Sequence, residues 1–224
     1  MLRAWVIGGR RGIGKAITLE LERHDIFVMA SDETTVDARS VPQLAKAFDQ
    51  FKPNWIVYCA GVNQLMPAHT FADADALNMM DINALGFMRV ISLAAAAEAH
   101  LKPSSIVAIS SDAARIPMRN SMAYCASKAA LSMAVRCAAR ELAPAIRVNA
   151  IAPGVVEGTA MSEAIDRQVE AIKHWTTDEA DQYLMTSVPM GRRAAMDEIA
   201  HMVYTTLDGP QYLTGSIIEV NGGR

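Results

Sequence analysis

Tyr124 and Lys128 are the residues whose types and spacing most directly suggest chemistry. A separation of four residues places both side chains on one face of a helix. A free phenol, with a pKa of about 10, is a poor base at neutral pH, but a nearby ammonium favours the phenolate and lowers that pKa. Such a pair is a general acid and base for interconverting an alcohol and a carbonyl. The alternative is an ordinary surface pair, because this spacing often occurs by chance.

Two polar residues elsewhere are candidates to assist this pair. Ser111 comes 13 residues before Tyr124, just after an apolar run that is typical of a strand. Active sites of open parallel sheets lie at that end of the strands, where a hydroxyl can orient a substrate oxygen. Otherwise Ser111 caps a helix or turn. Asn83 lies within a predicted helix, where asparagine is mildly unfavourable. It therefore either serves the site or is a solvated surface amide.

A glycine-rich segment lies between the first predicted strand and the first predicted helix. Glycines there let the chain turn sharply and bring bare backbone close to a pyrophosphate. The helix N-terminus adds free N–H groups and a positive dipole end. The alternative is a glycine-rich turn that binds nothing, but the placement favours dinucleotide binding. The predicted contacts in this segment are Gly8, Arg10, Arg11, Gly12, Ile13 and Gly14.

Strands and helices alternate along almost the whole chain, and the strands are continuous apolar runs rather than alternating ones. This pattern predicts a doubly wound parallel sheet with helices on both faces, a Rossmann-like three-layer α/β/α fold. We expect one domain over residues 1–224, with a substrate lid of short helices at about 155–190. The expected strands are 3–7, 26–30, 35–37, 55–60, 105–109, 147–152 and 216–220. The expected helices are 12–23, 41–51, 77–99, 124–143 and 196–207.

Composition excludes several classes of protein. The 224 residues are 51% hydrophobic and carry 21 Lys+Arg against 24 Asp+Glu, so nothing favours nucleic-acid binding. No apolar run approaches the roughly 20 residues that span a membrane, and no signal peptide is evident. Five dispersed histidines give no metal-ligand spacing. Three scattered cysteines, Cys59, Cys125 and Cys137, are typical of core residues in a reducing, cytoplasmic protein.

These motifs, taken in order, resemble the short-chain dehydrogenase/reductase family nearly from end to end. The family's glycine motif matches Gly8, Gly12 and Gly14. Its catalytic serine, tyrosine and lysine fall on Ser111, Tyr124 and Lys128, and its helix asparagine, which holds a water in a proton relay, falls on Asn83. The segments 147–154, 212–215 and 221–223 resemble its later motifs.

The resemblance implies a hydride transfer between nicotinamide and a secondary alcohol or ketone. Tyr124 then exchanges the proton, Ser111 positions the substrate oxygen, and Lys128 also holds the nicotinamide ribose. It implies further cofactor contacts, including the backbone of Val156 against the carboxamide. These are Asp37, Ala60, Gly61, Pro153, Gly154 and Val156.

Four positions depart from the family pattern. Ile7 replaces the threonine of the glycine motif, and Tyr58 and Cys59 replace two asparagines before Ala60 and Gly61. We expect altered local hydrogen bonding rather than loss of binding. The slot that often holds a cofactor-contacting threonine is Gly158, with Thr159 one residue later, so Thr159 contacts the cofactor only if the loop shifts.

The choice between the two nicotinamide cofactors rests on opposing charges. Asp32 lies 18 residues after Gly14, near the spacing at which a carboxylate accepts the ribose hydroxyl of NAD. Together with Glu33 it would repel the 2′-phosphate of NADP. Arg10 and Arg11 favour NADP, because NADP-dependent members often carry a basic residue there, or are simply solvated. We favour NAD, with NADP as the alternative.

Two other functions stay open: a dinucleotide-binding sensor or scaffold without turnover, and an isomerase or dehydratase that uses the same site. The helix 124–143 is apolar on more than one side, which predicts a homodimer or homotetramer. The residues at 155–190 suggest an apolar or ring-shaped substrate.

Overall fold

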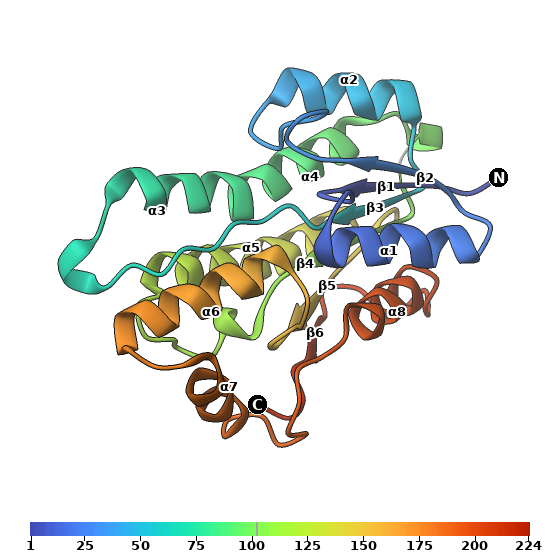
Figure 1. Ribbon diagram of the computed structural model, residues 1–224. Helices are drawn as coiled ribbons and strands as arrows, with labels where there is room; N and C mark the ends of the chain where they lie inside the picture. The colour runs from blue at the N-terminus through green and yellow to red at the C-terminus, as the bar shows by residue number, and fades with distance from the viewer. Residues whose placement is uncertain (102) are drawn as a thin grey trace.

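A computed structural model describes residues 1–101 and 103–224. Six strands form one parallel sheet in the order β2-β1-β3-β4-β5-β6 (Figure 1). They are β1 (Arg3–Ile7), β2 (Phe27–Ser31), β3 (Trp55–Tyr58), β4 (Ser105–Ile109), β5 (Arg147–Pro153) and β6 (Ile217–Val220). From β1 the chain first adds β2 on one side and then returns to add β3 on the other side, so the strand order reverses between β1 and β3. Ligands bind at this point in such folds. The predicted doubly wound parallel sheet is confirmed.

Two apolar cores, one on each face of the sheet, attach the helices. On one face α1 (Gly12–Arg23) and α8 (Met196–Leu207) bury residues such as Ile17 and Val203. On the other face α2 (Val41–Phe51), α4 (Gly86–Ala96) and α5 (Met122–Leu142) bury residues such as Phe87 and Leu131. Alternate residues of each strand belong to different cores, which explains why the strands are apolar throughout.

The short strand predicted at 35–37 does not form, and β2 is the edge of the sheet. Asp32 is the physical cause, because its carboxylate accepts hydrogen bonds from the backbone N–H of Thr34 at 3.1 Å and from the Thr34 hydroxyl at 2.7 Å. The backbone N–H of Val36 also donates to the Asp32 carbonyl, at 2.8 Å. These local bonds close a turn where an extended strand was expected.

The helix predicted at 77–99 begins earlier and is interrupted. It consists of α3 (Asp73–Met80), a π-helical turn η2 (Asp81–Leu85) and α4. The stretch Asp73–Ala96 is long and apolar enough to cross a membrane, which the sequence prediction did not anticipate. Buried helices of soluble proteins pass the same test, and here Phe87, Val90 and Ala94 pack in the core.

The segment at 155–190 forms α6 (Ala160–Lys173) and α7 (Thr177–Met185); α7 is short as expected, but α6 is a full-length helix of 14 residues. Each begins with a threonine that caps the first turn. Single 3₁₀ turns lie at η1 (Ala68–Thr70), η3 (Ala99–Leu101) and η4 (Asp112–Ala114). One cysteine prediction is wrong: Cys59 and Cys125 are partly buried, but Cys137 is exposed on α5.

Candidate active site

The residues predicted to carry chemistry gather at the carboxyl ends of four neighbouring strands. Gly8 follows β1, Ala60 follows β3, Ser111 follows β4, and Gly154 follows β5. Because the strands are parallel, these ends share one edge of the sheet. The topology therefore unites groups that are up to 146 residues apart in sequence.

The glycine segment forms a tight loop in which side chains have no room. A Cβ on Gly8, whose φ is +82°, would lie 2.7 Å from the backbone nitrogen of Ala60. One on Gly14 would lie 1.9 Å from the Gly8 carbonyl oxygen. A Cβ on Gly12, whose φ is +52°, would make only ordinary contact with Thr159, at 3.7 Å, and Arg11 gives α1 no side-chain cap. The first-turn N–H groups of α1 are therefore available to an anion, so the loop fits the pyrophosphate of a dinucleotide.

Thr159 borders the same loop. Its Cβ lies 3.7 Å from where a side chain on Gly12 would begin, and its hydroxyl caps α6 by accepting the N–H of Ser162 at 2.9 Å. The N-terminal turn of α6 thus lies next to that of α1. Thr159 therefore lies beside the glycine loop, and its contact with a cofactor stays a prediction.

Tyr124 and Ser111 are both nearly buried, at 8% and 9% exposure. Burial raises the pKa of Tyr124 to about 12, and a hydrogen bond with Ser111 offsets part of that rise. The Ser111 hydroxyl also accepts the N–H of Ala113 at 3.2 Å, which caps η4. The interpretation of Ser111 as the cap of a turn is confirmed, and its role toward a substrate oxygen stays a prediction.

Lys128 lies beneath Tyr124 on the same face of α5. Its Nζ donates to the Ile109 carbonyl at 2.9 Å and is 5.8 Å from the centre of the Tyr124 ring. Burial lowers the pKa of Lys128 to about 8. The expectation that Lys128 brings the phenol below its ordinary pKa is wrong for this structure, because burial has the larger effect on Tyr124.

Asn83 lies fully buried in the π-helical turn, so the surface-amide alternative is wrong. Its Oδ1 accepts the N–H of Val62 at 2.8 Å, and its Nδ2 donates to the Val62 carbonyl and the Ser127 hydroxyl, both at 2.9 Å. A Cβ on Gly61 would lie 3.4 Å from both Asn83 Oδ1 and Lys128 Nζ. The hydrogen bonds of Asn83 thus join the loop after β3 to α5, close to Lys128.

The predicted nicotinamide end lies after β5. Val156 pairs in parallel with Ala194. The bonds of that bridge are made by the Val155 carbonyl and the Glu157 N–H, so the polar groups of Val156 face the other way. A Cβ on Gly154 would lie 2.9 Å from Asn221 Cα, and the Gly154 N–H continues the sheet to Val220 after Pro153.

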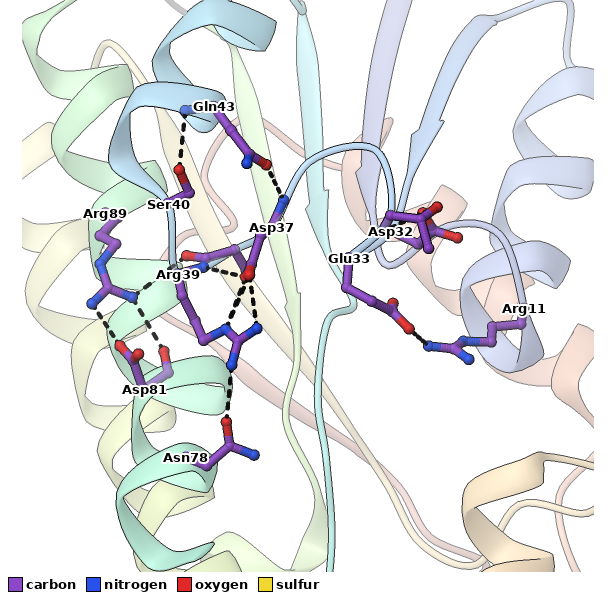
Figure 2. A network of polar contacts seen from close by, with 12 residues as sticks. Arg11, Asp32, Glu33, Asp37, Arg39, Ser40, Gln43, Asn78, Asp81 and Arg89 are labelled. Carbon is purple, nitrogen blue, oxygen red and sulfur yellow. Dashed lines mark hydrogen bonds and ion pairs between the residues drawn. The ribbon is translucent and has the colours of Figure 1, made fainter. Parts of the chain in front are cut away.

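The opposite end of the site carries the charges that bear on cofactor choice (Figure 2). Arg11 is ion-paired with Glu33, and Arg10 Nε lies 3.8 Å from Asp32 Oδ2. Hydrogen bonds from Thr34 hold the pKa of Asp32 below its usual value. The acidic and basic residues that favoured different cofactors in the sequence therefore form ion pairs with each other in the structure.

Asp37 is engaged by its own neighbours (Figure 2). Its carboxylate accepts bonds from Arg39 Nε at 3.0 Å and Nη2 at 2.8 Å, which lower its pKa. The backbone N–H of Asp37 donates to the Gln43 side chain at 2.8 Å, and Arg39 also reaches Asn78 of α3. Asp37 and Asp32 both lie in the loop after β2, as predicted contacts to one cofactor require.

An apolar cluster lies beside the Tyr124 ring and consists of Met66, Met79, Ala113 and Ala123, with Val62 and Met118 at its edge. The Leu65 N–H donates to Gln168 of α6 at 2.9 Å, so α6 is attached next to this cluster. A separate hollow of about 460 Å³ is lined by Glu157, Gly158, Ala195, Met196 and Asp197. None of the predicted catalytic residues lines that hollow.

Sequence reasoning missed an ion pair beside Ser111. Asp112 is 3% exposed and pairs with Arg224 at 2.9 Å, while its other oxygen lies 3.3 Å from the Ser111 hydroxyl. The only signal was an acidic residue directly after two serines. The two partners are 112 residues apart, which no local pattern reveals.

Arg224→Met is expected to lower the free energy of unfolding by about 3–5 kcal/mol, because it leaves the buried Asp112 carboxylate unpaired. The matched control is Arg115→Met. Arg115 pairs with Glu219, but their side chains are 59% and 41% exposed, so this loss should cost about 0–1 kcal/mol. Urea unfolding measures both variants, and equal losses would contradict the expectation.

Comparison with known proteins places this geometry in context. A family model described as enoyl-(acyl carrier protein) reductase matches residues 34–224. The chain is similar to a vibriobactin-specific 2,3-dihydro-2,3-dihydroxybenzoate dehydrogenase of Vibrio cholerae, at 28% identity over 97% of this chain and 94% of that protein. It is also similar to a galactitol 2-dehydrogenase of Rhizobium johnstonii, at 33% identity over 93% of this chain and 79% of that protein.

A crystal structure of an actinorhodin polyketide ketoreductase variant with NADPH superposes with a TM-score of 0.89, at 26% identity and with 99% and 96% of the two chains covered. The match over residues 34–224 and the relatives aligned nearly end to end confirm the resemblance that the motifs carried. The chain therefore belongs to the short-chain dehydrogenase/reductase family and is an NAD(P)-dependent oxidoreductase that acts on CH–OH groups.

Proposed function

We propose that this enzyme reduces an apolar ketone, or oxidises the matching secondary alcohol, with Tyr124 as the residue that exchanges the proton. The observation that carries the proposal is the grouping of Tyr124, Ser111, Lys128 and Asn83 beside the glycine loop. The nicotinamide supplies or takes up the hydride when it is bound. Ser111 orients the substrate oxygen toward the phenol, and Lys128 and Asn83 support that arrangement from behind.

The Tyr124 phenol is the group that would donate the proton in ketone reduction. Because burial raises its pKa to about 12, the phenol carries its proton at neutral pH. A protonated phenol beside a carbonyl oxygen donates the proton that ketone reduction consumes. The oxidative direction first requires loss of that proton.

The test is to incubate the protein with NADH or NADPH and a panel of ketones, and with NAD⁺ or NADP⁺ and the corresponding alcohols, while following nicotinamide absorbance. We expect turnover of apolar or cyclic compounds. Tight cofactor binding without any turnover would favour a sensor or scaffold. Conversion of a substrate without net change in absorbance would favour an isomerase or dehydratase.

The preference for an apolar substrate rests on the cluster beside Tyr124, in which Val62 and the adaptable side chain of Met118 stay partly exposed over buried Met66 and Met79. Two of the nearby cations are already engaged, because Arg224 pairs with Asp112 and Arg115 pairs with Glu219. A neutral substrate therefore fits these surroundings better than an anionic one. Lid residues Met161, Trp175 and Leu184 are of the same apolar character.

The proposed cofactor is NAD. Asp32 is ionised, is fixed by the hydroxyls of Thr34 and Thr35, and lies at the end of β2, where the two cofactors differ. The charge of Arg11 is neutralised by Glu33, so Arg11 would attract the 2′-phosphate of NADP less strongly. NADP is the alternative, in which these arginines leave their acidic partners.

Asp32→Ala is expected to improve NADP use relative to NAD by at least about tenfold, because it removes a like charge facing the 2′-phosphate. Arg11→Ser should change NAD use far less. Asp32→Asn is the matched control, since its amide oxygen still accepts the Thr34 bonds while the charge is gone. The readout is the ratio of NADPH to NADH dissociation constants. An unmodified protein that prefers NADPH would show that the arginines dominate.

We further propose that residues 155–190 form a lid that is ordered by cofactor. Arg193 joins the two lid helices through Asp166 at 2.9 Å and Asp181 at 2.8 Å, and Thr159 borders the glycine loop. A cofactor at that loop would contact the first turn of α6. Hydrogen exchange at 155–190 is therefore expected to slow when NADH is added, while exchange in β4 stays constant. Equal exchange with and without NADH would contradict the lid.

The proposed assembly is a homodimer or homotetramer in the cytoplasm. Large apolar side chains are exposed on neighbouring helices, and these are Leu77, Leu85, Met88, Met122 and Met133. A second copy that covers α4 and α5 would bury them. The three free cysteines suit a reducing compartment.

A further inference from the structure

Tyr58 is a fully buried tyrosine at the end of β3, where the family's motif has an asparagine. A buried hydroxyl requires a hydrogen-bond partner. Here the Tyr58 hydroxyl donates to the backbone carbonyl of Ile82 at 2.5 Å, across 24 residues of sequence. Burial also raises the pKa of Tyr58, so this hydroxyl remains a donor throughout the pH range of a working enzyme.

The carbonyl that Tyr58 binds is the one that the π-helical turn leaves without its usual donor. In a regular α-helix the N–H of Gly86 would bond to the carbonyl of Ile82, four residues earlier. In η2 that N–H donates instead to Asp81, five residues earlier. The hydrogen bond from the Tyr58 hydroxyl thus takes the place of the missing helical hydrogen bond to the Ile82 carbonyl. It thereby stabilises the turn with its extra residue.

Gly86 provides the space for this contact. A Cβ on Gly86 would lie 2.0 Å from the Tyr58 hydroxyl oxygen and 3.1 Å from the ring carbon that bears it. The position is helical and needs no unusual backbone angle. Glycine is therefore required here by the tyrosine, and the two residues form a matched pair.

The π-helical turn determines the direction in which Asn83 points. From η2 its amide reaches both polar groups of Val62 and the hydroxyl of Ser127, and it lies beside Gly61, across from Lys128. We propose that Tyr58 is a positioning residue that keeps the turn Asp81–Leu85 in its π form and thereby aims Asn83 at the loop behind Lys128. Only the catalytic consequence of this contact rests on the proposed function.

Hydrogen exchange of the cofactor-free protein tests the positioning directly. In Tyr58→Phe, exchange is expected to become about three- to tenfold faster in peptides that cover 61–66 and 80–88. Peptides from β4 and from the end of α5 should keep their protection. Tyr212→Phe is the control, because Tyr212 is fully exposed. Unchanged exchange at 61–66 would overturn the proposal, and so would a uniform increase over the whole core, since that indicates general destabilisation.

The pairing with Gly86 gives a second, independent measurement. Gly86→Ala alone is expected to disrupt 80–88 strongly, because the new Cβ meets the hydroxyl. The same substitution in the Tyr58→Phe background should have a clearly smaller effect, because the clashing oxygen is gone. Thermal unfolding and exchange of the four proteins complete the cycle. Equal effects of Gly86→Ala in both backgrounds would overturn the matched pair.

A kinetic measurement addresses the catalytic consequence. Tyr58→Phe is expected to lower kcat several-fold and to raise the KM for cofactor by less than Lys128→Ala does, because Asn83 lies close to Lys128 without lining the glycine loop. A change confined to KM would overturn this part. If the unmodified protein turns over no ketone, the proposed function fails, but the exchange measurements still decide the role of Tyr58.

Discussion

Tyr124→Phe is expected to lower turnover by a factor of about 10²–10⁴ while cofactor affinity stays almost unchanged. Phenylalanine keeps the packing of the ring in the apolar cluster and removes only the hydroxyl that exchanges the proton with substrate. Steady-state kinetics with an active ketone measures the first effect. Titration of NADH fluorescence measures the second.

Tyr212→Phe is the control for this prediction, because Tyr212 is fully exposed and lies outside the proposed lid. It should retain the rate of the unmodified enzyme. Near-native turnover by the Tyr124 variant would exclude it as the acid and base. Loss of cofactor binding together with turnover would mean that the substitution had damaged the fold around η4 instead.

Lys128→Ala should impair both turnover and cofactor affinity, since one buried ammonium is proposed to support the phenol and to hold the nicotinamide ribose. We expect a loss of at least about tenfold in each, because a buried charged hydrogen bond is worth about 1.5–3 kcal/mol. Lys46→Ala, on the exposed surface of α2, is the control. A loss in turnover alone would separate Lys128 from cofactor binding.

The pH dependence of cofactor affinity offers a further check on Lys128. Burial lowers its pKa to about 8, so the ammonium is present below that pH and is lost above it. Affinity for NADH should therefore fall as the pH rises through about 8 in the unmodified protein. In Lys128→Ala that dependence should disappear. Parallel profiles of the two proteins would exclude the ammonium as a ribose contact.

The sequence predicted the sheet and the site well, because both depend on local patterns. Apolar runs followed by glycine or serine placed Gly8, Gly61 and Ser111 at one edge, and helical spacing placed Tyr124 above Lys128. The site residues were therefore brought together largely as expected. Their roles in catalysis stay predictions until the variants are measured.

The features that the sequence did not predict come from contacts across the fold. Burial, which depends on packing, raised the pKa of Tyr124 against the expected influence of Lys128. The π-helical turn at Asn83 depends on the contact of Tyr58 with the Ile82 carbonyl, across 24 residues of the chain. The missing strand is a different case: hydrogen bonds of Asp32 to its own neighbours outweighed the β-propensity of Thr35 and Val36.

The turn that replaces this strand makes the two ends of the cofactor site respond differently to ionic strength. Around Asp32 and Asp37 the loop is fixed by solvent-exposed charges, including the pair of Arg11 and Glu33 and that of Asp37 and Arg39 (Figure 2). Dissolved salt screens such pairs over about 8–10 Å. Tyr124, Lys128 and Asn83, at the other end of the predicted site, are buried, so salt hardly reaches them. Salt is therefore expected to weaken the charged contacts of the loop after β2 first and to leave these three buried residues in place.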